Sequence, residues 1–142
     1  GNWKRESARF APSLRVFVVH RSETSEALEA PSKARLAVTD LVITTYGTVG
    51  RDFNDMGEVG WQRVVLDEAQ AIKNSATRSS KAVRSLPSEH RVALTGTPVE
   101  NRLSEMRSIL DFCNPGVLGT AWLATRRKAA ALPAQTDADP QA

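Results

Sequence analysis

Two adjacent acids, Asp67 and Glu68, are the side chains of this sequence best suited to chemistry. They come directly after a short apolar run that ends at Leu66, the kind of stretch that forms a buried strand. A hard cation such as Mg²⁺ takes oxygen ligands and keeps several waters, so one carboxylate can hold it, often through water. The other carboxylate is then free to orient or deprotonate an attacking water. The pair therefore indicates a site for magnesium and a phosphate.

A second polar turn, Thr95-Gly96-Thr97-Pro98, follows another apolar run. The carboxyl ends of parallel strands open on one edge of a sheet, where ligands bind. If the two strands lie close together, the acids face this turn across one crevice, and its hydroxyl and backbone donors can sense a terminal phosphate. A structural alternative stays open at this point: Asp67 caps the helix that follows, and Glu68 is a solvated first-turn acid.

Four apolar, β-branched runs supply the strands that would position these residues. They are nearly continuous rather than alternating, which is typical of strands covered on both faces in a parallel sheet. Helix-like segments separate them, so the order predicts βαβ units and an α/β fold, with a mostly parallel sheet and helices on both faces. The predicted strands are residues 15–20, 40–46, 63–68 and 91–97, and the predicted helices are residues 2–10, 77–86 and 104–113, with a mixed segment at 23–36.

The helices and the end of the domain have their own signals. Asn2 and Thr77 are candidate helix caps. Past residue 124 the sequence is rich in Ala, Pro, Gln and Asp and too poor in large apolar groups to join a core, so we expect a lobe over residues 1–124 and a disordered or aberrant tail over 125–142. The last helix should bury one apolar stripe, made of Leu103, Met106, Ile109, Leu110 and Cys113.

The composition sets broad limits on function. The 142 residues, 41% of them hydrophobic, suffice for one domain with a real core. A net charge of +3 and a pI near 9.4 are compatible with nucleic acid, but many other enzymes share them. The single cysteine, Cys113, excludes an internal disulfide and suits a reducing compartment. No apolar run approaches the roughly 18 residues of a membrane span, so no membrane partner is expected. Because the sequence starts "GNWKRESARF", without Met, we expect it to come from the middle of a longer protein.

Long stretches around both strand-end motifs resemble the Swi/Snf chromatin-remodelling family of helicase-like ATPases, within helicase superfamily two. The resemblance rests on "VVLDEAQAIKN" and "RVALTGTPVENRLSEMRSILDFCNPGVLG", with "NWKRESARFAPSLRVFVVH" and "DLVITTYGTVGRD" similar to earlier family motifs in the right order. It covers the chain from residue 1 to about residue 120. It implies a partial RecA-like lobe, ATP and Mg²⁺ as cofactors, and ATP-dependent translocation on double-stranded DNA that remodels protein–DNA complexes.

The resemblance also implies roles for single residues. Asp67 matches the acid that serves magnesium, through water, and Glu68 matches the acid that positions the hydrolytic water. Gln70 stands where many relatives have His, and in the family this residue links the nucleotide site to the nucleic-acid track. The motif that couples hydrolysis to lobe movement is matched by Thr95, Gly96, Thr97, Pro98 and Asn101.

Two further segments are similar to parts of the family that touch DNA. Hydroxyl and lysine contacts to phosphate position a strand without reading its sequence, so the implied partner is the double-stranded DNA backbone. Such a protein is expected in the cytoplasm, at the nucleoid of a bacterium or in the nucleus of a eukaryote. The matching residues are Thr44, Thr45 and Tyr46 in one segment and Trp3 and Lys4 in the other.

Two parts of a complete ATPase are not found in the sequence. It contains no G-x-x-x-x-G-K-S/T loop, the element that cradles phosphates on backbone amides and a lysine. The second lobe, which in the family supplies an arginine finger, has no counterpart either, and such a finger contributes roughly 10³–10⁵ in rate. The implied partners therefore include a P-loop segment and a second RecA-like lobe, and we expect no measurable ATP hydrolysis by this chain alone.

Two other functional classes compete with this interpretation. The first is a non-catalytic remnant that binds DNA or a protein partner, which would show salt-sensitive DNA binding without magnesium-ATP binding. The second is a phosphate-accepting α/β signalling domain with an acidic pocket, which needs a nucleophilic Asp at a strand end and a distant Lys. The match of "TGTPVEN" disfavours the second class.

Overall fold

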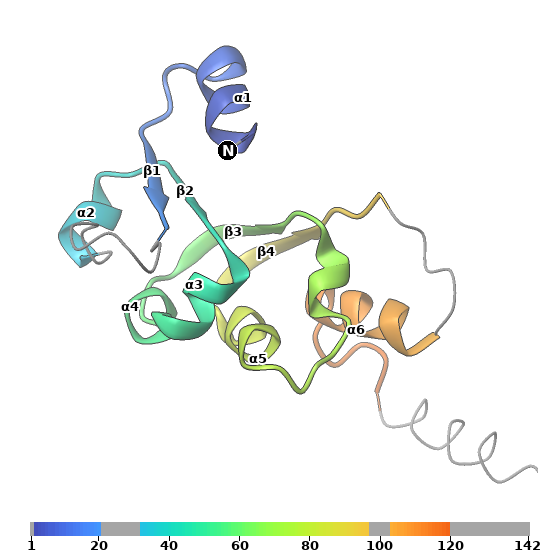
Figure 1. Cartoon of the computed structure of the whole chain (residues 1–142). Helices are drawn as coiled ribbons and strands as arrows, with labels where there is room; N and C mark the ends of the chain where they lie inside the picture. Colours follow the sequence, from blue (N-terminus) through green and yellow to red (C-terminus); the bar gives the residue numbers. More distant parts are fainter. Residues whose placement is uncertain (1, 21–31, 97–102, 120–142) are drawn as a thin grey trace, which may run out of the picture.

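The computed structural model describes residues 2–20, 32–96 and 103–119. Helices and strands alternate along the chain, as the sequence predicts for an α/β fold (Figure 1). In chain order the elements are α1 (Asn2–Phe10), β1 (Val16–Val19), α2 (Lys33–Ala37), β2 (Leu41–Thr44), α3 (Tyr46–Arg51), α4 (Phe53–Gly57), β3 (Trp61–Leu66), the 3₁₀ helix η1 (Ala69–Ile72), α5 (Arg78–Ser85), β4 (Ser88–Ala93) and α6 (Leu103–Cys113).

The strands form two parallel pairs. β1 pairs with β2 from Val16 opposite Leu41 to Val19 opposite Thr44, and β3 pairs with β4 from Trp61 opposite Ser88 to Leu66 opposite Ala93. Parallel pairing is therefore as predicted, but the single sheet is divided into two sheets of two strands. The division falls between β2 and β3, which are not paired with each other.

Helices cover one face of the β3–β4 pair within the described residues. Leu66 is buried on the side of η1 and α5, whereas Val65 is 45% exposed and its cross-strand partner Val92 is 37% exposed. The expectation of helices on both faces is therefore not met at this pair. β4 also starts three residues earlier than predicted, because Trp61 N–H donates to the carbonyl of Pro87 (3.0 Å) and extends the ladder in that direction.

Side-chain hydroxyls cap the starts of α2, α3 and α5. The hydroxyl of Thr77 accepts from Ser80 N–H (3.2 Å), which confirms the predicted cap of α5. Thr45 caps α3 in the same way. Asn2 does not act as predicted, since its Oδ1 accepts from the Arg5 guanidinium (2.6 Å) and the residue lies inside α1.

The crossover helices α3 and α4 were not predicted from the sequence. Both are short and contain glycine, which is unfavourable in a helix by about 1 kcal/mol relative to Ala. The sequence pattern therefore does not indicate helices there. Gly50 has a packing reason: a Cβ there would lie 3.1 Å from the hydroxyl of Ser79, so the absent side chain lets α3 approach α5 closely.

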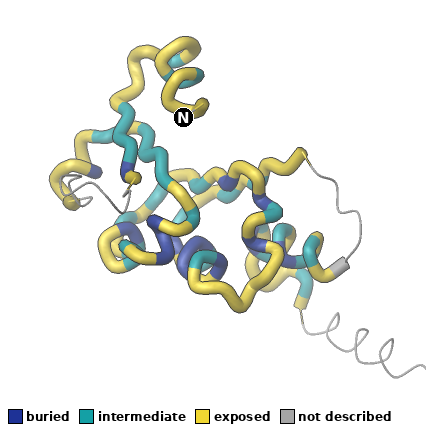
Figure 2. The backbone as a smooth tube through the Cα atoms, in the orientation of Figure 1, coloured by how far each residue is buried: buried dark blue, intermediate teal, exposed yellow. Residues whose placement is uncertain are grey.

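The core lies among α3, α5, η1 and α6, where Figure 2 shows the buried stretches. Phe112, Ile72 and Ala69 are completely buried there. Arg91 holds this region together, since its guanidinium lies 5.1 Å from the Phe112 ring centroid and donates to the carbonyl of Leu86 (2.9 Å). By contrast, α1 buries none of its residues and stands apart from the core (Figures 1 and 2).

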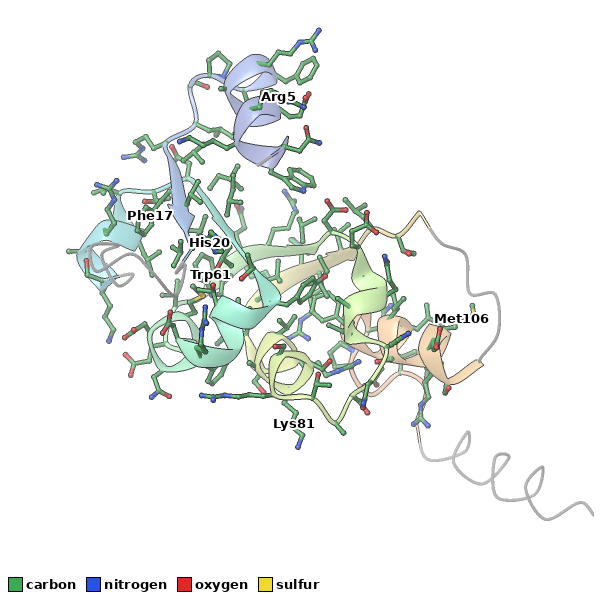
Figure 3. All side chains as sticks on the ribbon, viewed as in Figure 1. Arg5, Phe17, His20, Trp61, Lys81 and Met106 are labelled. Atoms are coloured by element: carbon green, nitrogen blue, oxygen red, sulfur yellow. The ribbon has the colours of Figure 1, made fainter. Side chains whose placement is uncertain are left out.

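The predicted apolar stripe of α6 is partly wrong. Ile109 and Cys113 pack against the core as expected, but Met106 is 45% exposed and Leu110 is 38% exposed. Met106 points outward from α6 in Figure 3. The inward face instead carries Phe112, which is fully buried, and Ser108, whose hydroxyl donates to the backbone carbonyl of Ile72 and also meets the Arg84 guanidinium. Burial of Phe112 and these polar contacts together hold this side of the helix inward.

No helix in the described ranges is long and apolar enough to cross a membrane.

Candidate active site at the carboxyl ends of β3 and β4

Asp67 and Glu68 lie at the carboxyl end of β3, and both side chains are exposed. One oxygen of Asp67 accepts from Glu68 N–H (2.9 Å), and the other accepts from the indole N–H of Trp3 (2.7 Å), which comes from α1. Glu68 has a left-handed backbone with φ 49° and ψ 52°, and it is the one non-glycine residue of the described ranges with positive φ. That conformation is unfavourable by about 1–2 kcal/mol for an L-residue. Backbone strain of this kind clusters at functional sites.

Gln70 joins the acids to the end of β4. Its side-chain amide donates to a carboxylate oxygen of Glu68 (2.6 Å), and its carbonyl oxygen accepts from the hydroxyl of Thr95 (3.0 Å). The backbone supports this link, since Ala69 N–H donates to the carbonyl of Leu94 (2.8 Å). The ends of β3 and β4, where the sequence predicts a nucleotide site, therefore lie close together, and Gln70 bridges them.

Tyr46 approaches the acids from the start of α3. Its hydroxyl donates to the backbone carbonyl of Asp67 (2.6 Å). Burial of the phenol, reinforced by the negative charges of Asp67 and Glu68, raises the pKa of Tyr46 to about 12. The phenol is therefore neutral and a hydrogen-bond donor over the whole physiological range.

The structural alternative for the acids can be judged from their hydrogen bonds. Glu68 occupies the cap position of η1 but makes no side-chain cap hydrogen bond. Asp67 accepts the N–H of its direct neighbour Glu68 rather than an N–H inside η1. Asp67 therefore does not act as the helix cap that the alternative required, whereas Glu68 is exposed as the alternative expected.

The residues expected to contact DNA differ in their exposure and in their hydrogen bonds. Lys4 is exposed on α1, and Trp3 is 45% exposed although its indole nitrogen is bonded to Asp67. Thr45 is exposed but its hydroxyl accepts from Thr48 N–H (3.1 Å), and the hydroxyl of Thr44 is buried. Gly96 is exposed in the turn that follows β4. Three residues of the expected coupling motif, Thr97, Pro98 and Asn101, lie outside the described residues.

The contacts of Asp67 fit a magnesium ion held through water. A carboxylate offers about four acceptor positions, and Asp67 uses two of them for Trp3 and Glu68. The described residues contain no group of three or more His, Cys, Asp or Glu side chains that could hold a metal. Mg²⁺ in nucleotide sites is bound by one or two carboxylates together with substrate phosphates, which matches such an open arrangement.

Sequence reasoning did not find the bonds of Trp3 and Tyr46 to Asp67. Both residues were assigned to DNA contacts, and 64 residues separate Trp3 from Asp67. No periodicity or spacing signals a contact over that separation, which depends on where the start of α1 lies relative to the end of β3.

Comparison with protein families and known structures identifies this arrangement. Residues 1–139 match the family model described as "SNF2-related domain". The chain is 41% identical over 139 residues to the "Putative ATP-dependent helicase/translocase YwqA" of Bacillus subtilis, covering 98% of this chain and 15% of that protein. It is 37% identical over 122 residues to the "TATA-binding protein-associated factor mot1" of Schizosaccharomyces pombe, covering 84% of this chain and 6% of that protein.

The fold is similar to a solved archaeal structure, the "Sulfolobus solfataricus SWI2/SNF2 ATPase core in complex with dsDNA". The TM-score is 0.69 at 41% identity, covering 90% of this chain and 26% of that one. The same core domain without DNA matches with a TM-score of 0.67. The predicted RecA-like α/β fold is confirmed, and the chain spans a small part of the length of its relatives. The chain belongs to the SNF2-related domain family.

Proposed function

We propose that this chain forms part of the first RecA-like lobe of an ATP-dependent DNA translocase that remodels protein–DNA complexes. One observation carries the proposal: a continuous hydrogen-bonded path runs from Thr95 through Gln70 to Glu68, beside Asp67, which is bonded to Trp3. An acid pair without a chemical role needs no such path to a second strand end and to a separate helix.

The two acids divide the work at the nucleotide. Asp67 would hold magnesium through water, and the bound ion would neutralise charge on the β- and γ-phosphates. Glu68 orients or deprotonates the attacking water, a contribution of about 10²–10⁴ in rate for a well-placed base. Its carboxylate is held by the amide of Gln70 (2.6 Å), which fixes where that base points.

Gln70 and the turn after β4 would couple the nucleotide to movement. The amide of Gln70 contacts Glu68 on one side and Thr95 on the other, so a change at the acids alters the position of Thr95. Gly96, Thr97, Pro98 and Asn101 complete the proposed coupling motif. A path of only two hydrogen bonds suits this task, because Gln70 is the one side chain between Glu68 and Thr95 on this path.

Contacts to the DNA backbone are proposed for Lys4, Trp3, Thr44, Thr45 and Tyr46. Exposed Lys4 on α1 is the cation among them, and phosphate contacts by such groups carry no sequence information. Trp3 and Tyr46 each bond to Asp67, so a strand bound at these segments lies next to the acids. DNA binding is then expected to change the surroundings of Asp67 directly.

The isolated chain holds half of the catalytic machinery. Its sequence has no G-x-x-x-x-G-K-S/T loop, so nothing in it offers the backbone cradle and lysine that hold the phosphates of ATP. We propose the boundary of the lobe at residue 124 and no ATP turnover by this chain above that of an Asp67→Ala control.

A chimera tests the proposal. Residues 2–119 would replace the matching part of the archaeal SWI2/SNF2 ATPase core, which is 41% identical. Expected are DNA-stimulated ATP hydrolysis by the chimera and its loss in Asp67→Ala. A chimera that folds and binds double-stranded DNA in a salt-dependent way, yet hydrolyses no ATP, contradicts the catalytic role and favours a non-catalytic DNA-binding remnant.

A further inference from the structure

The short helix η1 carries Gln70, the residue that links the proposed nucleotide acids to the end of β4. It has few hydrogen bonds of its own: Ala71 N–H donates to the carbonyl of Glu68 (2.9 Å), and Lys73 N–H donates to the carbonyl of Gln70 (3.1 Å). The last carbonyls of a helix have no partner inside it. The contacts that hold η1 in place must therefore come from neighbouring elements.

The helix α6 supplies such a contact at the end of η1 (Figure 1). The hydroxyl of Ser108 donates to the backbone carbonyl of Ile72, the last residue of η1. Both residues are buried, and Ile72 is buried completely. Buried backbone carbonyls are nearly always paired, and water has little access here to replace a lost donor. The bond therefore fixes the carboxyl end of η1 against α6.

Ser108 is itself held by α5. The Arg84 guanidinium donates to the hydroxyl and to the backbone carbonyl of Ser108, and it also donates to Asp111 further along α6 (3.2 Å). Bonds from an ionised donor are roughly twice as strong as neutral ones. Because a guanidinium can only donate, the proton of the Ser108 hydroxyl is left for the carbonyl of Ile72. The direction of this hydroxyl is therefore set, and three elements meet at one side chain.

The segment from Thr95 to Ser108 starts and ends at η1. The hydroxyl of Thr95 donates to the side chain of Gln70 (3.0 Å), and the hydroxyl of Ser108 donates to Ile72 at the end of the same short helix. The proposed coupling motif lies in this segment, ahead of α6. The position of Gln70 is therefore fixed from both ends of the segment that carries the motif.

We propose that Ser108 is a positioning residue, which holds η1 so that Gln70 keeps its bonds to the two strand ends. Within the described residues Ser108 bonds to η1 and not to the acids, so it acts through the backbone of this helix. A misplacement of about 1 Å can lower a rate roughly 10²-fold. The expected effect on turnover rests on the proposed ATPase function, whereas the hold of Ser108 on η1 is independent of it.

The first arm of the test uses the full chain and needs no activity. Ser108→Ala is compared with Ser80→Ala, a matched control, because Ser80 is also completely buried but its hydroxyl bonds to Thr77, the cap of α5. Hydrogen exchange of the Ala71 and Lys73 amides is measured, with amides of β3 and β4 as the reference for global stability.

Ser108→Ala is expected to speed exchange at these two amides by about tenfold or more relative to the reference amides, whereas Ser80→Ala does not. Equal exchange at η1 in the two variants overturns the proposal, and so does a change that is uniform over the chain. If Ser108→Ala does not fold, Ser108→Cys takes its place with the same outcomes, because a thiol is only a weak donor.

The second arm uses the chimera with the archaeal core and asks whether Ser108 acts through Gln70. Ser108→Ala should lower the turnover number by about tenfold to a hundredfold and change the KM for ATP by less than about twofold, while Ser80→Ala leaves both unchanged. In a Gln70→Ala background, Ser108→Ala should lower turnover by less than about twofold more.

Additive losses in the double variant overturn the proposal, because a structural loss unrelated to Gln70 would add in this way. An unmutated chimera that hydrolyses no ATP contradicts the proposed function instead. In that case the exchange at η1 decides by itself whether Ser108 positions this helix.

Discussion

The left-handed backbone of Glu68 predicts that glycine destabilises the fold less than alanine at this position, while both remove the proposed base. At φ 49° and ψ 52° an L-residue is strained by about 1–2 kcal/mol, and glycine is not. Glycine also gains freedom in the unfolded chain, which offsets about 0.4–1 kcal/mol of this. The matched comparison is Glu68→Gly against Glu68→Ala, because both lose the bond to Gln70 and differ only in the Cβ.

Glu68→Gly is therefore expected to be more stable than Glu68→Ala by about 1 kcal/mol, or roughly 2–4 °C in melting temperature for a chain of this size. Thermal unfolding followed by circular dichroism measures the difference, with urea unfolding as a second method. A glycine variant equal to or less stable than the alanine variant would refute the reasoning, since residue 68 would then not be held in the left-handed region.

Three more predictions concern single side chains. Phe112→Ala should lose about 3–5 kcal/mol of unfolding free energy because Phe112 is fully buried. Met106→Ala on the same helix should lose less than about 1 kcal/mol because Met106 is 45% exposed. Equal losses in urea unfolding would be inconsistent with the orientation of α6. Tyr46 is the one tyrosine of the chain, so ultraviolet titration should show a phenol that ionises near pH 12 when folded and near 10 in urea. Its raised pKa contributes stability that is complete below pH 10 and is lost as the pH rises through about 12. The side chain and the backbone N–H of Arg15 lower the pKa of Asp40 to about 2. The free energy of unfolding should therefore fall as the pH drops from about 4 to 2. In Asp40→Asn, the melting temperature measured over this pH range should depend less on pH.

The fold class was predictable from the sequence because it depends on local pattern. The runs of β-branched residues before Asp67 and Thr95 mark strands, and Thr77 marks a helix start through its hydroxyl. Each of these signals lies within or next to the element that it predicts. The parallel pairing of β3 with β4 then follows from the helical segments between the strands.

The details that the sequence did not show depend on contacts between distant residues. The inward face of α6 combines the buried ring of Phe112 with the hydroxyl of Ser108 on the backbone carbonyl of Ile72, and that polar contact is contained in no apolar periodicity. The division of the sheet between β2 and β3 is likewise not marked by a local pattern. The bond of Trp3 to Asp67 depends on where α1 packs. Each of these is a tertiary effect without a local signature.

The most direct test of the catalytic account separates nucleotide binding from turnover in the chimera with the archaeal core. In Glu68→Gln the carboxylate that would activate water becomes a neutral amide of the same size, while Asp67 is untouched. We predict that magnesium-ATP binds with an affinity within a few-fold of the unmutated chimera, whereas the DNA-stimulated turnover number falls by about 10²–10⁴. Turnover that survives this substitution, or a loss that appears only in nucleotide affinity, would contradict the role assigned to Glu68.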